Sequence, residues 1–547
     1  MKAKTLFVFL ILISANQLFS QSCKLSIPST QLSVDANNYN LLPGDTICIE
    51  AGNRDYLKIS NLHGDSLNYI IVINKGGSVN IQNNYHMFGV NFANCSYFRF
   101  TGTGSDSVNY GFKINGSKLN TNALSIDMKS TNYEIDHIEI ANAGFAGIMA
   151  KTDPQCNLSS NRGYFTQYQT SIHDNYIRNT EGEGLYIGHS FYNGYPTTCS
   201  GQPDTLYPHD IKGLRVYNNI LENCKWDGIQ IGCAVEDCEI FNNRVINYGV
   251  SQNNSQMAGI QIGGGTTGKC YNNFIANGSG SGINIFGLGN VLVFNNIVIN
   301  AGKNYFPGDL TKSVFGIFCD DRTTIAGSPF NIINNTIVNP KNDGIRFYSL
   351  QSSNNKLINN LIVNPGSLGT YSNNNQSYIN LKTGVNASLS NNYYSPDFTN
   401  LKLIDTLLNN YKPTVLSPLV NAGYHVGNLG IVFDFDYYPR PYSTDYDIGA
   451  YEYYPGNAIE KITETTETIS IFPNPSKGIF NISINSEKES KKANIIILNQ
   501  LGEVLLKKQC YSDELQSIDI SKIAKSGIYF IILHTENYHI IKKLIIQ

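Results

Sequence analysis

The stretch LRVYNNILEN at residues 214–223, followed by GIQIG at 228–232, contains the pattern on which the fold depends. The same succession of apolar residues, an Asn-Asn pair and a Gly-led run recurs along the chain as far as residue 366. The second Asn of each pair falls at Asn219, Asn243, Asn273, Asn296, Asn335 and Asn360, in steps of 24, 30, 23, 39 and 25 residues. A base period of about 23 residues with insertions in some copies predicts a solenoid.

The pattern inside one copy indicates which solenoid this is. Each copy holds three short alternating runs (Leu214 with Val216, then Ile220, then Ile229 with Ile231), whose period and β-branched residues predict strands. Three strands with turns between them form one coil of a parallel β-helix. The Asn-Asn pair falls between the run of Leu214 with Val216 and the run of Ile220, where Asn tolerates a tight bend and its amides can hydrogen-bond from coil to coil. Parallel crossovers favour right-handed winding.

The chain divides into four parts. Residues 1–20 have two lysines and a short apolar run, as a secretory signal peptide does, and no later apolar run is long enough to span a membrane. We expect the β-helix to occupy 21–454, with an N-terminal cap over about 21–115 and an irregular closing segment over about 400–454. Residues 455–468 are rich in Thr and Glu and predict a linker before a last domain at 469–547.

Composition narrows the class of protein. The net charge is −3 and only 15% of residues are charged, which makes nucleic acid an unsuitable partner. The eleven cysteines fit an oxidising compartment, and their odd number leaves at least one unpaired. Cys23 with Cys48 and Cys156 with Cys199 are the bridges that we expect. We also expect the protein to be a monomer.

The last 80 residues or so resemble the C-terminal sorting domain of the type IX secretion system. The elements FPNPSKGIF (472–480), LGEVL (501–505), SGIYFIIL (526–533) and KKLII (542–546) each have a counterpart in that family. The resemblance implies a small β-sandwich, recognition by the secretion machinery, and a secreted or outer-membrane surface-attached protein from which this domain is removed. Residues 42–52, LPGDTICIEAG, resemble the opening coils of pectate-lyase-like β-helices. The closing segment contains SPLVNAG (417–423), DFDYYPRP (434–441) and DIGAYEY (447–453), and it resembles that of Bacteroidetes surface β-helix proteins. The predicted fold is therefore all-β, a right-handed parallel β-helix followed by a β-sandwich.

In β-helices that act on polysaccharides, substrate lies along the strand that here begins with the recurring Gly. Alternation places Ile229 and Ile231 inside the coil, so Gln230 points outward to solvent. Reading the outward position coil by coil gives Met149, Tyr186, Gln230, Gln261, Asn284, Phe318 and Arg346. These amides, rings and one cation suit sugar hydroxyls, sugar faces and a uronate carboxylate, and they equally suit an ordinary hydrated β surface.

The position just before the Gly holds acidic residues in several coils, at Glu183, Asp227 and Asp343. If 189–210 is a pure insertion, Glu183 and Asp227 belong to consecutive coils, about 4.8 Å apart. Like charges at this distance raise one pKa or bind a cation such as Ca²⁺. The pair, with Glu181, is the candidate for acid–base catalysis or for a metal site, and an exposed acidic turn is the alternative. The nearby residues that could act as a base or neutralise charge are Lys225, Arg215, His189 and His209.

The sequence matches no specific enzyme family. Glu181-Gly182-Glu183 resembles the paired glutamates of chondroitinase-B-like and alginate-lyase β-helices, but Gly188 stands where those enzymes have a lysine. We therefore predict a secreted or surface protein that binds or degrades a polysaccharide, as a lyase or a glycoside hydrolase. The alternative is a non-catalytic adhesin or glycan-binding protein.

Overall fold

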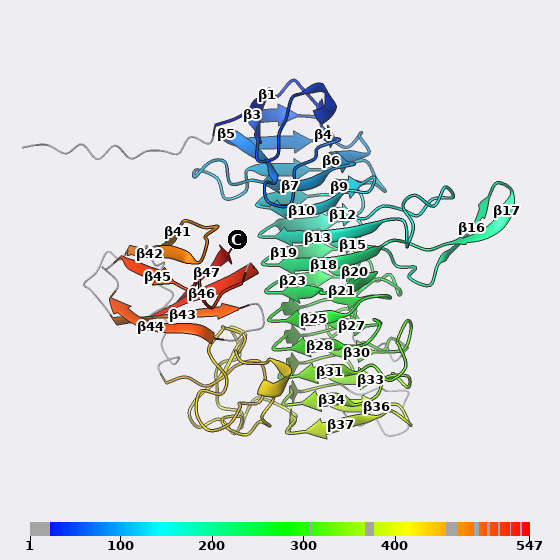
Figure 1. The fold of residues 1–547 in the computed structure, drawn as a ribbon. Coiled ribbons are helices and arrows are strands. Elements are labelled where there is room, and N and C mark those ends of the chain that lie inside the picture. The colour runs from blue at the N-terminus through cyan, green and yellow to red at the C-terminus, as the bar shows by residue number, and fades with distance from the viewer. Residues whose placement is uncertain are drawn as a thin grey trace, which may run out of the picture.

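The structure, a computed structural model, describes residues 22–306, 309, 311–366, 377–455, 468–485, 492–499, 504–511, 515–525, 527–535 and 539–546. Coils stack from β1 at one end to β38 at the other, and the C-terminal domain lies beside them (Figure 1). This confirms the predicted fold class. The signal peptide (1–20) and most of the linker (455–468) lie outside the described residues.

The strands that follow the recurring glycine belong to one twelve-stranded parallel sheet, which we call the glycine sheet. Its strands are β2 (Ser33–Asp35), β4 (Leu57–Ser60), β6 (Phe88–Ala93), β9 (Asn122–Asp127), β12 (Ile148–Ala150), β15 (Leu185–Ile187), β20 (Ile229–Ile231), β24 (Ile260–Ile262), β27 (Ile283–Ile285), β30 (Ile317–Cys319), β33 (Ile345–Phe347) and β36 (Ile379–Leu381). The glycine is required because its Cα lies close to side chains of the strands that follow the Asn-Asn pairs. A Cβ at Gly228 would collide with Val245, and one at Gly282 with Val298.

The other two strands of each coil belong to a 24-stranded parallel sheet that bends at the Asn-Asn pairs, which we call the asparagine sheet. Its strands are β1 (Leu25–Ile27), β3 (Thr46–Arg54), β5 (Ile70–Gln82), β7 (Ser96–Thr101), β8 (Phe112–Asn115), β10 (Thr131–Asp136), β11 (Ile138–Ala141), β13 (Thr166–His173), β14 (Tyr176–Thr180), β18 (Asp210–Tyr217), β19 (Ile220–Cys224), β21 (Ala234–Glu236), β22 (Glu239–Phe241), β23 (Arg244–Tyr248), β25 (Gly268–Tyr271), β26 (Phe274–Ala276), β28 (Val291–Phe294), β29 (Ile297–Ile299), β31 (Phe330–Ile333), β32 (Thr336–Val338), β34 (Asn355–Ile358), β35 (Leu361–Val363), β37 (Ala387–Ser390) and β38 (Tyr393–Ser395). Inward Ile, Val and Leu from both sheets fill one continuous core.

The two residues of each Asn-Asn pair have different roles. The second Asn is buried, and its amides form a ladder along the solenoid. Asn219 Nδ2, for example, donates to Asn243 Oδ1 at 3.0 Å, and Asn243 Nδ2 donates to Asn273 Oδ1 at 3.0 Å. The first Asn adopts the left-handed conformation, with a φ of 55° at both Asn218 and Asn242. The pair therefore makes the bend with one residue and joins the coils with the other.

The closing segment runs along the outside of the later coils. Its strands β39 (Leu403–Asp405) and β40 (Asn410–Pro413) pair antiparallel, and the short 3-10 helix η2 (Gly427–Leu429) follows; another, η1 (Ala36–Asn38), lies in the N-terminal cap. First Asn residues of the pairs hold the segment in place, since Asn272 Nδ2 donates to Asp434 O at 3.2 Å and Asn334 Nδ2 to Asp447 O at 2.9 Å. Apolar side chains of the segment pack on the stacked rings of Phe241, Tyr271 and Phe294.

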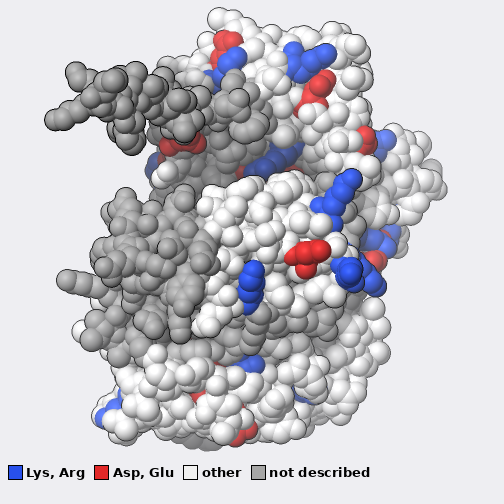
Figure 2. Space-filling model, turned by 60° about the vertical axis from the view of Figure 1, so that its left-hand side comes forward, with Lys and Arg blue, Asp and Glu red and all other residues white. Residues whose placement is uncertain are grey.

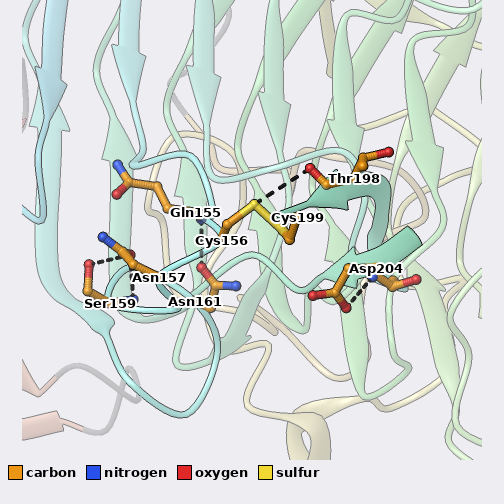
Figure 3. Close-up of a disulfide and its surroundings, with 9 residues drawn as sticks. Gln155, Cys156, Asn157, Ser159, Asn161, Thr198, Cys199 and Asp204 are labelled. Atoms are coloured by element: carbon orange, nitrogen blue, oxygen red, sulfur yellow. Dashed lines mark hydrogen bonds between the residues drawn. A yellow bond between two sulfur atoms is a disulfide. The ribbon is translucent and has the colours of Figure 1, made fainter. Parts of the chain in front are cut away.

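Two insertions project from one side of the solenoid between β12 and β18. The second contains the antiparallel hairpin of β16 (Tyr195–Cys199) and β17 (Gln202–Leu206), which stands away from the coils (Figure 1). A disulfide between Cys156 and Cys199 ties the two insertions together (Figure 3). The other expected bridge, Cys23–Cys48, joins the start of the N-terminal cap to β3 within the same cap.

The C-terminal domain is a small sandwich of two antiparallel sheets. One contains β41 (Thr468–Phe472), β42 (Ile479–Asn485) and β45 (Gln516–Asp519). The other contains β43 (Lys492–Asn499), β44 (Val504–Tyr511), β46 (Gly527–Thr535) and β47 (His539–Ile546). Buried residues such as Ile482, Ile497 and Ile531 fill the space between the sheets. Among the described residues, no helix is long and apolar enough to cross a membrane.

Candidate functional site

The outward residues of the glycine sheet lie in one column, in the register expected from the sequence. Tyr186 pairs with Gln230, Gln230 with Gln261, and the pairing continues through Asn284, Phe318 and Arg346. The expectation that Gln230 faces solvent is wrong, because its side chain is only 1% exposed. The insertion after β15 folds over it, and Gln230 Nε2 donates to Ser190 Oγ at 2.8 Å.

A groove of two adjoining cavities follows this column. The larger, of about 540 Å³, lies over β20 and β24, and the smaller, of about 260 Å³, lies over β24, β27 and β30. The walls come from the insertion at 190–194, the loop at 254–258 and the turn at 322–323. The column residues in contact with the cavities are Gln230, Gln261, Asn284 and Phe318. The groove therefore presents three amides in succession and then an aromatic ring along successive coils.

Glu183 and Asp227 lie in consecutive coils just beside the groove. The N–H of Gly184 donates to Asp227 O at 3.0 Å, so the 189–210 stretch is a pure insertion between these coils. The alternative of an exposed acidic turn is wrong, since both side chains are 0% exposed. Glu183 Oε1 accepts from Gln256 Nε2 at 3.2 Å, and Asp227 Oδ1 accepts from the Ala258 N–H at 2.6 Å. The 254–258 loop thus covers both carboxyl groups.

The environment of this pair disfavours two negative charges. Burial raises the pKa of Glu183 to about 7. Burial and then the nearby Glu183 charge raise the pKa of Asp227 well above its ordinary value. Glu183 Oε2 and Asp227 Oδ2 are buried without a hydrogen-bond partner in the described part of the chain. Protonation removes the charge that burial disfavours, whereas Ca²⁺ needs six to eight oxygen ligands and the pair offers only two uncommitted ones. The ligand set therefore fits protonated carboxyl groups better than calcium.

Three other predicted residues lie apart from this pair. Glu181 is exposed and forms an ion pair with Lys225 at 2.6 Å. Arg215 lies on β18 in the asparagine sheet, where it binds Asp237 at 2.8 Å. Arg346 is on the glycine sheet but is buried against Asp343, with Nε 2.7 Å from Oδ2. Sequence spacing did not distinguish these positions because each lies within a few residues of the recurring pattern.

A charged cluster lies at the other end of the column; its member His189 was predicted, but Lys151 and Asp153 were missed. Lys151 follows β12 at the register position that Gly188 has in the next coil, because Ala150 pairs with Ile187. Its Nζ lies 5.2 Å from the Tyr186 ring centroid and forms an ion pair with Asp153. His189 Nε2 is 3.4 Å from the same carboxylate. In the coil of Glu183, Gly188 stands where the resembling lyases have a lysine. This chain has a lysine, Lys151, at the same register position one coil earlier.

Two further histidines, His209 and His173, make contacts away from the carboxyl pair. Burial lowers the pKa of His209 to about 4, and its Nε2 accepts from the Thr152 N–H at 3.2 Å. His173, with Glu134 and Asp136, forms a cluster on the asparagine sheet whose ligand atoms lie within 4.8 Å of one another. Arg99 already supplies the cation there, since its Nε is 3.2 Å from Glu134 and 2.7 Å from Asp136.

Two protein-family models match this chain, one in the solenoid and one in the C-terminal domain. The model of the right-handed β-helix region matches residues 206–395, and that of the secretion system C-terminal sorting domain matches residues 470–547. The chain is a right-handed parallel β-helix protein. It carries the C-terminal sorting domain of the type IX secretion system, as predicted, and is therefore a secreted protein. No curated protein matches the chain.

Several solved structures resemble the chain at low identity. An alginate lyase from Paenibacillus sp. is 14% identical, with 68% of this chain and 99% of that chain covered and a TM-score of 0.34. The complex of XylC with xylose is 12% identical, with 78% and 98% covered and a TM-score of 0.36. The A-module of the Azotobacter vinelandii mannuronan C-5 epimerase AlgE4 is 10% identical, with 65% and 87% covered and a TM-score of 0.27.

Proposed function

We propose that this secreted protein binds a polysaccharide in the groove along the glycine sheet. The observation that carries the proposal is the match between the outward column and the two cavities. The larger cavity, at about 540 Å³, has the size of an ordinary ligand site, which spans roughly 300–1,000 Å³. A ligand that extends over several coils meets the same kinds of group repeatedly, as a polymer of sugars requires.

The polar groups of the groove suit sugar hydroxyls. Gln230 Oε1 and Asn284 Oδ1 are buried acceptors with no hydrogen-bond partner among the described residues. A buried acceptor left unpaired costs roughly 1–3 kcal/mol, and a ligand hydroxyl would remove that cost. The Phe318 ring adds an apolar face between these amides and Arg346 in the column. The groove thus combines acceptors with a ring of the kind that packs on a sugar face.

Affinity electrophoresis against a polysaccharide panel tests this function. We expect Gln261→Ala and Phe318→Ala each to weaken the retardation by at least about threefold, because a lost hydrogen bond or ring contact is worth on the order of 1 kcal/mol. Tyr394→Ala is the control, since Tyr394 is an exposed aromatic residue of the asparagine sheet. Equal weakening by all three changes, or no retardation by any polymer, would refute the proposal.

Cleavage of the bound polymer is a second candidate function, and the carboxyl pair favours it. A carboxyl with a pKa near 7 holds a proton at neutral pH and can give it to a leaving oxygen. Because the 254–258 loop covers both groups, this loop must move before substrate reaches them. Released reducing ends and the ultraviolet absorbance of unsaturated uronates distinguish hydrolysis from elimination. Glu183→Gln should abolish either product and preserve binding, whereas a wild-type protein that forms neither product is a non-catalytic glycan-binding protein.

A further inference from the structure

Arg322 stands at the junction of the two groove cavities and lines both of them. Its guanidinium carbon lies 3.6 Å from the ring centroid of Phe286. Within the described part of the chain, this guanidinium has neither an ion pair nor a hydrogen bond. Arg346, further along the same sheet, is by contrast held against Asp343 at 2.7 Å. Arg322 is thus a cation in the groove with its donors available.

The backbone around Arg322 is fixed by the neighbouring coils. Thr323 Oγ1 donates to Phe286 O at 2.9 Å and accepts from the Gly265 N–H at 3.0 Å. Ile325 N–H donates to Leu288 O at 2.9 Å. These bonds position the turn over the glycine sheet, so the arginine needs little ordering when a ligand arrives. Preorganised cations of this kind bind an anionic group more tightly than mobile ones.

Nearby acidic groups leave the guanidinium available. Asp321 is occupied by the N–H groups of Leu350 and Gln351 and by the Ser349 hydroxyl. Asp320 is within electrostatic reach of Arg322 but forms no ion pair with it. An arginine fork that lacks an internal carboxylate fits a planar carboxylate or a sulfate from outside.

We propose that Arg322, stacked on Phe286, binds the acidic group of an anionic polysaccharide at the junction of the two cavities. The proposal rests on the proposed function and adds the substrate class. An acidic sugar satisfies both sets of groups at once, since its anionic group accepts from Arg322 and its hydroxyls donate to Gln230 Oε1 and Asn284 Oδ1. A neutral sugar offers the guanidinium only hydroxyl acceptors and no opposite charge, which makes the weaker contact.

Binding to matched polymers tests this inference with the purified full chain. The probes are polygalacturonate and alginate, each beside its carboxyl-reduced neutral counterpart, and dextran sulfate beside dextran. The variants are Arg322→Gln and Arg322→Lys. The matched control is Arg244→Gln, because Arg244 also stacks on a phenylalanine, Phe274 at 4.3 Å, but on the asparagine sheet.

We expect the wild type to bind an acidic polymer at least tenfold more tightly than its neutral counterpart, and Arg322→Gln to lose that preference. Arg322→Lys should keep part of it, and Arg244→Gln all of it. A preference for the polyuronates identifies a carboxylate, and one for dextran sulfate identifies a sulfate. Equal wild-type binding of acidic and neutral polymers, or an unchanged preference in Arg322→Gln, overturns the inference but leaves the proposed function standing. Absence of binding to every polymer overturns both.

Discussion

The position before the recurring glycine shows how one place in the repeat acquires different chemistry in different coils. Asp343 is buried, but Arg346 supplies a cation at 2.7 Å and Asn380 Nδ2 donates to the same oxygen at 3.0 Å. Glu183 and Asp227 are equally buried and have no ion pair within the described residues. Burial of a carboxylate without a cation favours its protonated form. The neighbours of each carboxyl, and not its place in the repeat, therefore determine its chemistry.

Glu183→Gln should flatten the dependence of stability on pH. Burial raises the pKa of Glu183 from 4.5 to about 7 in the folded protein. A raised carboxyl pKa contributes stability that is complete below about pH 4.5 and is lost as the pH rises through about 7. The loss is on the order of 3 kcal/mol. Urea unfolding between about pH 5 and pH 8 measures it, and the variant should be the more stable protein at the upper end.

The control for this prediction is Glu181→Gln, because Glu181 is exposed and paired with Lys225. It should leave the pH profile unchanged. Calcium tests whether the carboxyl pair holds a proton or a cation, because a cation that binds the folded protein stabilises it by mass action. If millimolar calcium raises the melting temperature of the wild type and Glu183→Gln removes the rise, the pair binds a cation rather than a proton.

Ile229 and its neighbour test the inside–outside register. Ile229→Asp places a carboxylate in the fully buried core and should lower the free energy of unfolding by several kcal/mol, roughly 4. Gln230→Asp should cost less, about 1–3 kcal/mol, because it loses the bond to Ser190 but borders the groove. Gln261→Asp, in the same column and only half-buried, should be nearly silent in denaturant unfolding. Equal losses at Ile229 and Gln261 would show that the register is wrong.

At the level of structural elements, the Asn-Asn turn divides its two tasks between its residues. Asn295 has a φ of 52° and donates to Phe433 O of the closing segment at 2.8 Å. Asn296 is buried, accepts from the N–H and Nδ2 of Asn273, and donates to Asn335 at 3.0 Å. The first residue therefore joins the solenoid to its closing segment, and the second joins one coil to the next.

Asn296→Ala should destabilise the solenoid by roughly 2–4 kcal/mol, because it leaves the buried N–H of Asn273 without its acceptor and removes one of the acceptors of Asn273 Nδ2. Thermal or denaturant unfolding measures the loss. Asn331→Ala is a suitable control, since Asn331 is a partly exposed asparagine on β31 in the same sheet. A loss at Asn296 no greater than that at Asn331 would mean that the ladder contributes little to stability.

At the scale of the whole molecule, the two sheets of the solenoid serve different neighbours. The sorting domain faces the asparagine sheet, where Phe530 and Lys543 line a cavity of about 250 Å³ with Tyr217 and Phe241. The described lining of the groove comes from the solenoid and its loops alone. The groove is therefore open whether or not the sorting domain is attached.

On the face shown in Figure 2, charged side chains are scattered rather than gathered into one charged patch.

Processing should remove both ends of the chain. We expect the mature protein to begin near Gln21 and to end close to the linker at 455–468, because the sorting domain match covers 470–547. Intact-mass measurement of protein from the cell surface or the medium checks this. Surface protein that still carries FPNPSKGIF at 472–480 would contradict it.

The sequence by itself determined the solenoid and its strand register, because these depend on periodicities of two residues and of one coil. It determined the sorting domain through the resemblance of its last 80 residues or so to a known family. The outward column from Tyr186 to Arg346 could be read directly, since alternation fixes which side chains leave the core. The Asn-Asn bends and both expected disulfides also follow from local chemistry and spacing.

Only the tertiary structure decided what covers this column and which charges meet there. Loops of unequal length fold back over the coils, so Gln230 became buried and Glu183 and Asp227 lost contact with water. Arg322 reaches the column from a turn outside the repeat, and no spacing within the repeat points to it. Lys151 lies at a repeat position, but only the structure shows that its Nζ is 5.2 Å from the Tyr186 ring centroid. The physical reason is that periodicity reports the contacts repeated in every coil, whereas the groove is built from insertions that occur once.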